Sequence, residues 1–190
     1  MLTRHKVLLT VMVIGLTAAV GGFGIFAAFS GTTSNPGNSF AAGTVTISDN
    51  DSDSALYNVS NQKPGVTTEK CIKVTYAGSL DSSVKLYAST VTAGGQYVDL
   101  AITSGTGALT DCSDFTADVS NSSVYSGTLK NFADTHTDWT SGLADNPLAQ
   151  TKWAQNDAVT YRFRVDVQDN NSAQGATTGS HSFTWEAQNQ

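Results

Sequence analysis

The chain has 190 residues, of which 39% are hydrophobic and 14% are charged. This apolar share is enough for one packed domain and excludes a wholly disordered chain, while three prolines and 17 glycines without a G-X-Y period exclude collagen. The net charge of -6 has the wrong sign for a protein that neutralises phosphates, so nucleic acid and anionic lipid are excluded as expected partners.

The beginning of the chain has the pattern of a secretory signal. A short basic start precedes an uncharged, apolar run over residues 7–29. The small residues Ala27 and Ala28 offer a peptidase site, so we expect a signal peptide over residues 1–27. The product is then secreted, extracellular or at the cell surface, and it contacts the membrane only before cleavage. The alternative is a permanent anchor, because the uncharged run is long enough to span a bilayer.

A polar stretch follows the expected cleavage site. Residues 28–42 begin with Ala28 and Phe29, carry no charge and contain the turn-forming sequence SGTTSNPGNS. We expect a flexible N-terminal arm here, followed by a β-sandwich domain over residues 43–190.

Seven stretches alternate between apolar and polar residues, as half-buried strands do. In the clearest of them, Tyr161 and Phe163 share one face while Thr160 and Arg162 share the other, which predicts one buried and one solvated face. The stretches cover residues 43–48, 55–60, 70–76, 84–88, 97–103, 158–167 and 181–187.

Helical spacing of apolar residues occurs in one place, near residues 128–136. Leu129, Phe132 and Ala133 recur there at helical intervals, and Thr128 is suited to cap the start. Parallel sheets would need helices between the strands, and this sequence does not supply them. The sequence therefore predicts an all-β fold, an antiparallel sandwich with one short helix.

Two cysteines, Cys71 and Cys112, occur in a chain with an export signal. Thiols outside the cytosol are normally oxidised, so we expect one disulfide between them. The alternative is a pair of buried free thiols. No CxxC spacing supports a redox-active or zinc-ribbon motif.

Five segments in a fixed order carry a family resemblance: GGFGIFAAF, FAAGTVTIS, NVSNQKPGV, KCIKVTY and the terminal FTWEAQNQ. Together they resemble the TasA/camelysin family of secreted proteins from Gram-positive bacteria, over nearly the whole chain. The cysteine pair departs from the founding fibre-forming members and is similar to an actinobacterial branch.

The resemblance implies a processing route, a fold and a role. A dedicated signal peptidase of the SipW type would act at an Ala-Ala-Phe-like junction, which maps to Ala27, Ala28 and Phe29. The family's fold is a jelly-roll-like sandwich, and its best-known members build extracellular biofilm fibres.

Part of this family carries a metallopeptidase label, but the sequence has no zinc motif. A zincin needs two histidines one helical turn apart with a glutamate between them, and HExxH is absent. The histidines, His5, His136 and His181, stand alone in sequence. We expect no catalytic residues, no cofactor and no zinc site.

An acidic run resembles the first half of a calcium loop. Asp49, Asp51 and Asp53 place carboxylates at alternate positions, but Ser54 and Ser60 stand where the loop needs glycine and glutamate. A solvated turn is the simpler interpretation, with a weak surface calcium site as the alternative.

The leading functional hypothesis is a structural protein of the extracellular matrix that self-associates into fibres. Antiparallel sandwiches have exposed edge strands, so the arm from Ala28 could add to an edge of the next subunit, with Phe29 filling a pocket. Such a homopolymer grows head to tail. Its partners are then other copies of itself, the signal peptidase and other matrix or surface components. The alternatives are a monomeric module that binds carbohydrate or protein, for which Trp139 and Trp153 are candidates, and a metallopeptidase.

Overall fold

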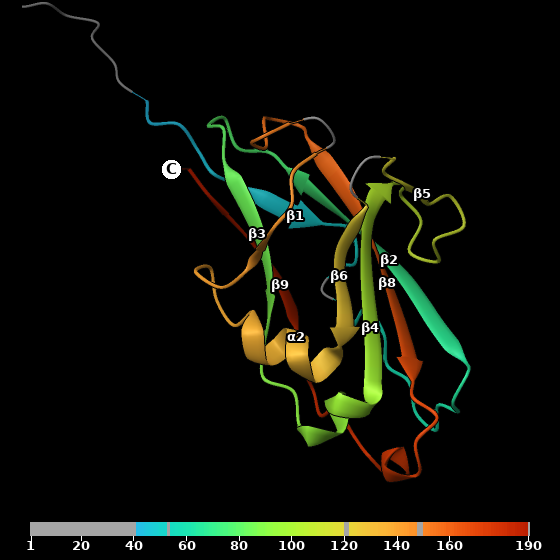
Figure 1. Ribbon diagram of the computed structural model, residues 1–190. Coiled ribbons are helices and arrows are strands. Elements are labelled where there is room, and N and C mark those ends of the chain that lie inside the picture. Colours follow the sequence, from blue (N-terminus) through green and yellow to red (C-terminus); the bar gives the residue numbers. More distant parts are fainter. Residues whose placement is uncertain (1–40, 53, 120–121, 148–149, 190) are drawn as a thin grey trace, which may run out of the picture. The chain divides into compact units, whose positions relative to one another are not determined.

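Figure 1 shows the computed structural model of the chain, which describes residues 41–52, 54–119, 122–147 and 150–189. The span Ala42–Gln190 folds as one unit. The predicted signal peptide and nearly all of the predicted arm lie outside the described residues.

The strands form two antiparallel sheets (Figure 1). The first is six-stranded, with the order β1-β2-β8-β4-β5 and with β6 also paired to β4, and the second has the order β7-β3-β9. The first sheet contains β1 (Ile47–Asp49), β2 (Thr67–Tyr76), β8 (Ala158–Val167), β4 (Val98–Thr106), β5 (Thr116–Ala117) and β6 (Ser123–Thr128). The second contains β7 (Leu143–Ala144), β3 (Ser83–Ala88) and β9 (Phe183–Gln188), and two 3-10 turns, η1 (Ala93–Tyr97) and η2 (Asn171–Ala173), lie in the connections.

One hydrophobic core lies between the sheets. Alternate residues of the long strands point into it, as their period-two pattern predicts, and Phe163 and Tyr76 are fully buried there. Aromatic rings join the sheets, since Phe163 of β8 lies 4.7 Å from Phe183 of β9 between ring centroids. The structure thus confirms the all-β antiparallel sandwich.

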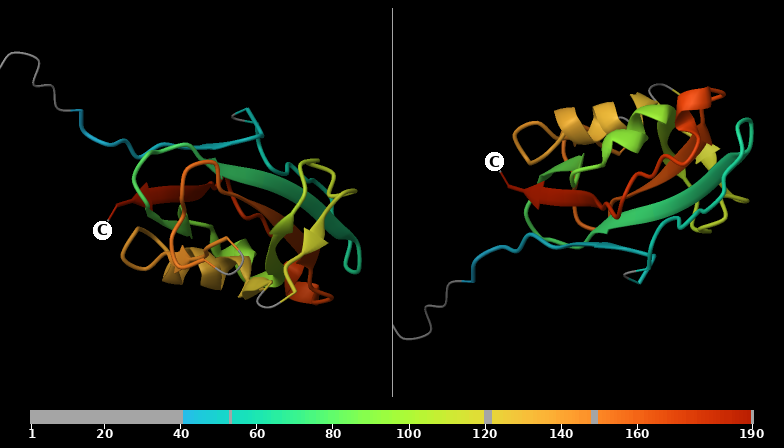
Figure 2. Two further views of the ribbon diagram at one scale, coloured as in Figure 1. Left: turned by 90° about the horizontal axis from the view of Figure 1, so that it is seen from above. Right: turned by 90° about the horizontal axis from the view of Figure 1, so that it is seen from below.

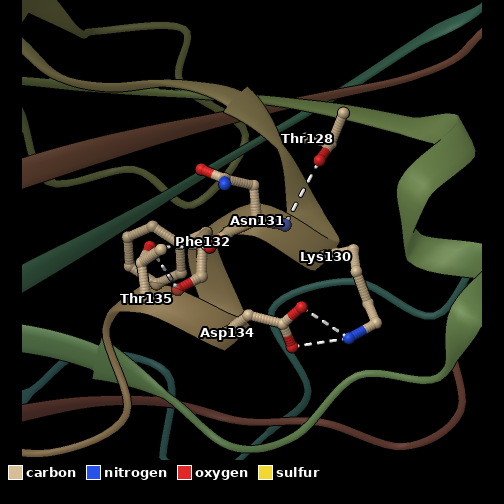
Figure 3. A network of polar contacts seen from close by, with 6 residues as sticks. All are labelled: Thr128, Lys130, Asn131, Phe132, Asp134 and Thr135. Carbon is tan, nitrogen blue, oxygen red and sulfur yellow. Dashed lines mark hydrogen bonds and ion pairs between the residues drawn. The ribbon is translucent and has the colours of Figure 1, made fainter.

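The predicted helix is present as α2 (Leu129–Thr135). Figure 3 shows its capping contacts: the Thr128 side chain accepts a hydrogen bond from the Asn131 backbone N–H at 3.2 Å, and Lys130 pairs with Asp134 one turn later. Its apolar face is buried in the core. The helix closes one side of the sandwich by contacting β6, β3 and β4, while β1 and β9 lie near each other on the opposite side (Figure 2).

The predicted strand at residues 55–60 is wrong, because this stretch has no strand partner. Its apolar residues instead lie in an irregular segment, in which Leu56 packs against the core and the Tyr57 ring lies 6.4 Å from Phe183. The stretch at 43–48 is shorter as a strand than predicted, since β1 begins at Ile47 and the preceding residues bond to a turn through the Thr44 carbonyl. Alternating polarity thus correctly indicated partly buried side chains here, but the backbone does not pair as a strand.

The sequence pattern also missed three short strands, β5, β6 and β7. β5 and β7 have two residues each, too few to show a period, and the exposed Ser126 and Gly127 interrupt the pattern of β6. The remaining predicted strands agree with β2, β3, β4, β8 and β9 to within a few residues.

Candidate assembly edges and a buried carboxyl

Several predicted site residues fall where the structure offers no description. Ala27, Ala28 and Phe29, which form the expected cleavage site and the start of the arm, lie outside the described residues, and so does Asp53. No helix in the described part of the chain is long and apolar enough to cross a membrane.

The remaining acidic-run residues lie at the end of β1. A carboxylate oxygen of Asp49 accepts a hydrogen bond from the Asp51 backbone N–H at 3.3 Å, which is the geometry of an Asx turn. Within the described ranges, no group of three or more His, Cys, Asp or Glu residues is arranged to hold a metal ion. The geometry of Asp49 and Asp51 is therefore that of a turn.

The two histidines of the folded part each have a structural contact. His136 ends α2 and its Nδ1 lies 2.6 Å from the Ser141 carbonyl. The Nδ1 of His181 lies 3.1 Å from the Gly179 carbonyl, so it carries the proton and the Nε2 accepts from the Tyr57 hydroxyl at 2.8 Å.

The tryptophans do not form a shared sugar platform. Trp153 is fully buried, and its indole N–H donates to the Asp145 carbonyl at 2.7 Å. Trp139 is half-buried, but the Lys85 ammonium lies 5.1 Å from its ring centroid and also donates to its carbonyl. One ring is thus part of the core and one face of the other is covered by a cation.

Strand β9 has an unpaired backbone edge. The Ser89 N–H donates to the Ser182 carbonyl, which sets the register so that alternate residues of β9 bond toward β3. The intervening residues Phe183, Trp185 and Ala187 direct their N–H and C=O groups away from β3, and these groups have no backbone partner among the described residues. Their side chains pack against the core. Within the described part of the chain, β9 therefore presents a row of backbone donors and acceptors without backbone partners, beside partly buried apolar side chains.

One end of this edge is covered by a side chain and not by a strand. The Tyr57 hydroxyl bonds to His181, just before β9, and burial raises the pKa of this tyrosine above its ordinary value. The contact holds the irregular segment around Tyr57 beside β9 without occupying the backbone of the strand.

Strand β2 has an edge of the opposite kind. Beyond the short β1, the Lys73 N–H donates to the side-chain carbonyl of Asn50 at 2.8 Å, and the Cys71 N–H donates to the Thr110 carbonyl at 3.0 Å. The Asn50 amide also donates to the Ala108 carbonyl at 2.9 Å. Non-strand groups thus occupy the edge of β2 where a further strand would pair.

The loop that supplies these carbonyls, residues 107–115, is called the strap below. The disulfide Cys71–Cys112, with a Cα–Cα distance of 5.2 Å, joins it to β2 and forms the bridge that the sequence predicts. Within the strap, the Asp114 carboxylate accepts from the backbone N–H groups of Ala108 and Leu109. Because Ile72 points into the core, the neighbouring Cys71 points to the outer face of the sheet, and the disulfide lies on that face.

The strap also covers part of the polar face of β8. The Thr160 hydroxyl donates to the Gly107 carbonyl at 2.6 Å, and the Arg162 guanidinium lies 4.8 Å from the Phe115 ring centroid. This corrects the expectation that the whole face is solvated, because Thr160 is only 2% exposed. Local alternation could not show that a distant loop crosses this face.

A partly buried carboxyl, which the sequence reasoning missed, belongs to Asp145, directly after β7. Burial raises the pKa of Asp145 to about 6 and the nearby Asp118 charge adds to the rise, while hydrogen bonds from Tyr161 and Ser104 oppose it. One carboxylate oxygen of Asp145 is buried without a hydrogen-bond partner in the described part of the chain. In sequence, this residue belongs to Asp-Asn-Pro, which reads as a turn and conceals the burial.

The partner of this carboxyl reaches the second sheet. Burial, and secondarily the Asp145 charge, raises the pKa of Tyr161 well above its ordinary value. The Tyr161 ring lies 5.4 Å from that of Trp185 in β9. A charge on Asp145 therefore acts close to the packing under the β9 edge.

Comparison with known proteins gives one family. Residues 3–190 match the family described as camelysin metallo-endopeptidase. No curated protein matches the chain.

Proposed function

We propose a structural role from the premise that this chain belongs to the camelysin family. The protein is a secreted component of the extracellular matrix that self-associates into fibres. Each subunit donates its N-terminal arm, residues 28–42, to the β9 edge of the next subunit. The structural role is supported by membership of this family, whose best-known members the sequence resembles. The mode of association is supported by the open edge of β9 and the covered edge of β2.

One observation carries the proposal: the outward N–H and C=O groups of β9 are unpaired among the described residues, at Phe183, Trp185 and Ala187. An extended peptide can pair with such an edge, with main-chain hydrogen bonds for affinity and alternate side chains in apolar pockets. The arm is uncharged and begins with Ala28 and Phe29, so it suits this partner. A donated arm makes a heterologous contact that need not close, and it propagates into a filament.

Processing sets the order of events in this proposal. Before the signal peptidase acts at Ala27, the first arm residues continue the apolar run of the signal and are not free to donate. Cleavage releases the arm outside the cell, so assembly is confined to the exported protein.

We test the proposal by negative-stain microscopy of the mature protein and two variants. Deleting residues 28–38 removes the donor, and Ala187→Pro removes one outward N–H from the acceptor edge without touching the ladder to β3. Both variants should stay folded by circular dichroism and form no fibres. Ala187→Ser keeps the N–H and should polymerise as the intact protein does. Fibres from either blocked variant would contradict the donated-arm mechanism.

The family description names a peptidase, and we propose that this chain is not one. HExxH is absent from the sequence, and His136 and His181 are bonded to Ser141 and to Tyr57. Purified mature protein with added zinc should therefore not cleave a denatured protein substrate. A chelator-sensitive activity that persists through repeated purification would overturn this assignment.

A further inference from the structure

The strap covers a backbone edge that could otherwise pair. Glu69, Cys71 and Lys73 of β2 direct their N–H and C=O groups away from β8, because the Tyr76 N–H bonds to Asp157 on the β8 side and the direction alternates along the strand. At Cys71 and Lys73 the N–H groups are satisfied by Thr110 and Asn50. The cover is built from a carbonyl of the strap and one amide side chain.

The sequence of this edge is complementary to itself. If a second copy of β2 lay antiparallel with Cys71 opposite its own counterpart, Glu69 of each copy would lie opposite Lys73 of the other. Opposite charges facing each other across an antiparallel pair stabilise that register. Both side chains lie on the outer face of the sheet, since their neighbour Ile72 points into the core.

We propose that residues 69–73 of β2 form a latent dimerisation edge for a second copy of this chain, covered by the disulfide-held strap. The contact is isologous, with its two-fold axis at Cys71, so it closes into a dimer and does not propagate. This distinguishes it from the head-to-tail contact at β9. The short β1 pairs with residues 74–76 and sets the limit of the new ladder.

Opening the strap requires reduction of the disulfide. A dithiol reductant supplies two electrons and two protons, which convert the Cys71–Cys112 bond to two thiols while the reductant becomes a disulfide. The strap then has no covalent link to β2 and is held by its hydrogen bonds to Cys71, Asn50 and Thr160 and by the contact of Phe115 with Arg162. In the oxidised protein these bonds and the disulfide act together, and the edge stays covered.

The first experiment removes the disulfide from the mature chain. The double variant Cys71→Ser and Cys112→Ser should change from monomer to dimer in the fibre-free supernatant, with a doubled mass by light scattering. The same change should occur with Ala187→Pro added, because that substitution blocks only β9. A double variant with native circular dichroism and monomer mass would overturn the proposal and leave the β9 mechanism untouched.

Charge exchange then tests the register. Lys73→Glu in the double variant places glutamates opposite each other and should return the protein to monomer, and adding Glu69→Lys should restore the dimer. Mixing the Lys73→Glu and Glu69→Lys forms should give heterodimers. Dimers that persist through Lys73→Glu would show that a different surface is responsible.

A second measurement covers the case in which the double variant does not fold. In wild-type protein treated with a dithiol, hydrogen exchange at the Cys71 and Lys73 amides should first accelerate and then become protected as protein concentration rises. Acceleration that does not depend on concentration would overturn the dimer.

Discussion

Strands β2 and β9 belong to different sheets and both lie next to β1, but they present different edges. β9 ends its sheet, its N–H and C=O groups at Phe183, Trp185 and Ala187 have no backbone partner among the described residues, and the Tyr57 side chain lies at one end. The edge of β2 is covered by β1, by Asn50 and by the strap. Exposed edges invite pairing with other chains, so of these two edges β9 is the one that an added strand can reach. In the proposed fibre, this difference directs the donated arm to β9.

The largest expected effect concerns the cover of β2. Replacing Cys71 by Ser opens a loop whose ends are 41 residues apart, which the chain-entropy model values at about 4 kcal/mol of unfolding free energy. The thermal midpoint should fall accordingly in calorimetry. Exported wild-type protein should show no free thiol when unfolded without reductant. Full alkylation of both cysteines under those conditions would show that the disulfide is absent. The strap would then have no covalent link to β2, and the covalent difference between the edges of β2 and β9 would be lost.

A smaller effect concerns the packing under β9. Because the folded-state pKa of Asp145 is about 6, above its ordinary value of 3.8, the folded protein holds a proton that the unfolded chain releases as pH rises from 4 to 6. Stability should therefore fall across this window by roughly 2 to 3 kcal/mol. Asp145→Asn should be nearly neutral at pH 4 and stabilising above pH 6. Urea titrations at several pH values would measure this, and an unchanged slope in the variant would contradict it.

Asn50→Ala weakens the cover of β2 without opening the disulfide. It removes the acceptor of the Lys73 N–H and the donor to the Ala108 carbonyl, for an expected loss of about 1 kcal/mol because water replaces these partners at the surface. Hydrogen exchange at the Lys73 amide should accelerate while that of the core strands is unchanged. Asn50→Asp is the matched control, since it keeps the acceptor and loses the donor. Equal exchange rates in the wild type and Asn50→Ala would mean that Asn50 does not protect the edge.

The smallest effect concerns the contact at the end of β9. Tyr57→Phe removes the hydrogen bond to His181 but keeps the ring next to Phe183, so stability should fall by about 0.5 to 1 kcal/mol. Fibre formation should be unchanged or faster, because less of the β9 edge is covered. Slower assembly would show that Tyr57 contributes to the acceptor site instead of covering it.

The elements that the sequence predicted well are those whose pattern is local. The alternation over 158–167 coincides with β8, and the spacing from Leu129 to Ala133 with its Thr128 cap coincides with α2. Side chains of successive residues must face opposite sides of a strand, and every third or fourth residue must share a face of a helix, so a buried layer appears directly in the order of residues. The expected export of the chain and its two cysteines led to the prediction of a bridge between Cys71 and Cys112, which the structure has.

Tertiary structure decided which edges are open and which groups are buried. Residues 55–60 alternate like a strand, but they form an irregular segment that pairs with no strand among the described residues, and the Tyr57 hydroxyl bonds to His181 just before β9. Thr160 is buried by the distant strap, and Asp145, which reads as part of a turn, has a raised pKa because the fold partly buries its carboxyl. Backbone pairing and desolvation depend on what approaches from elsewhere in the chain, and no residue's neighbours in sequence determine that.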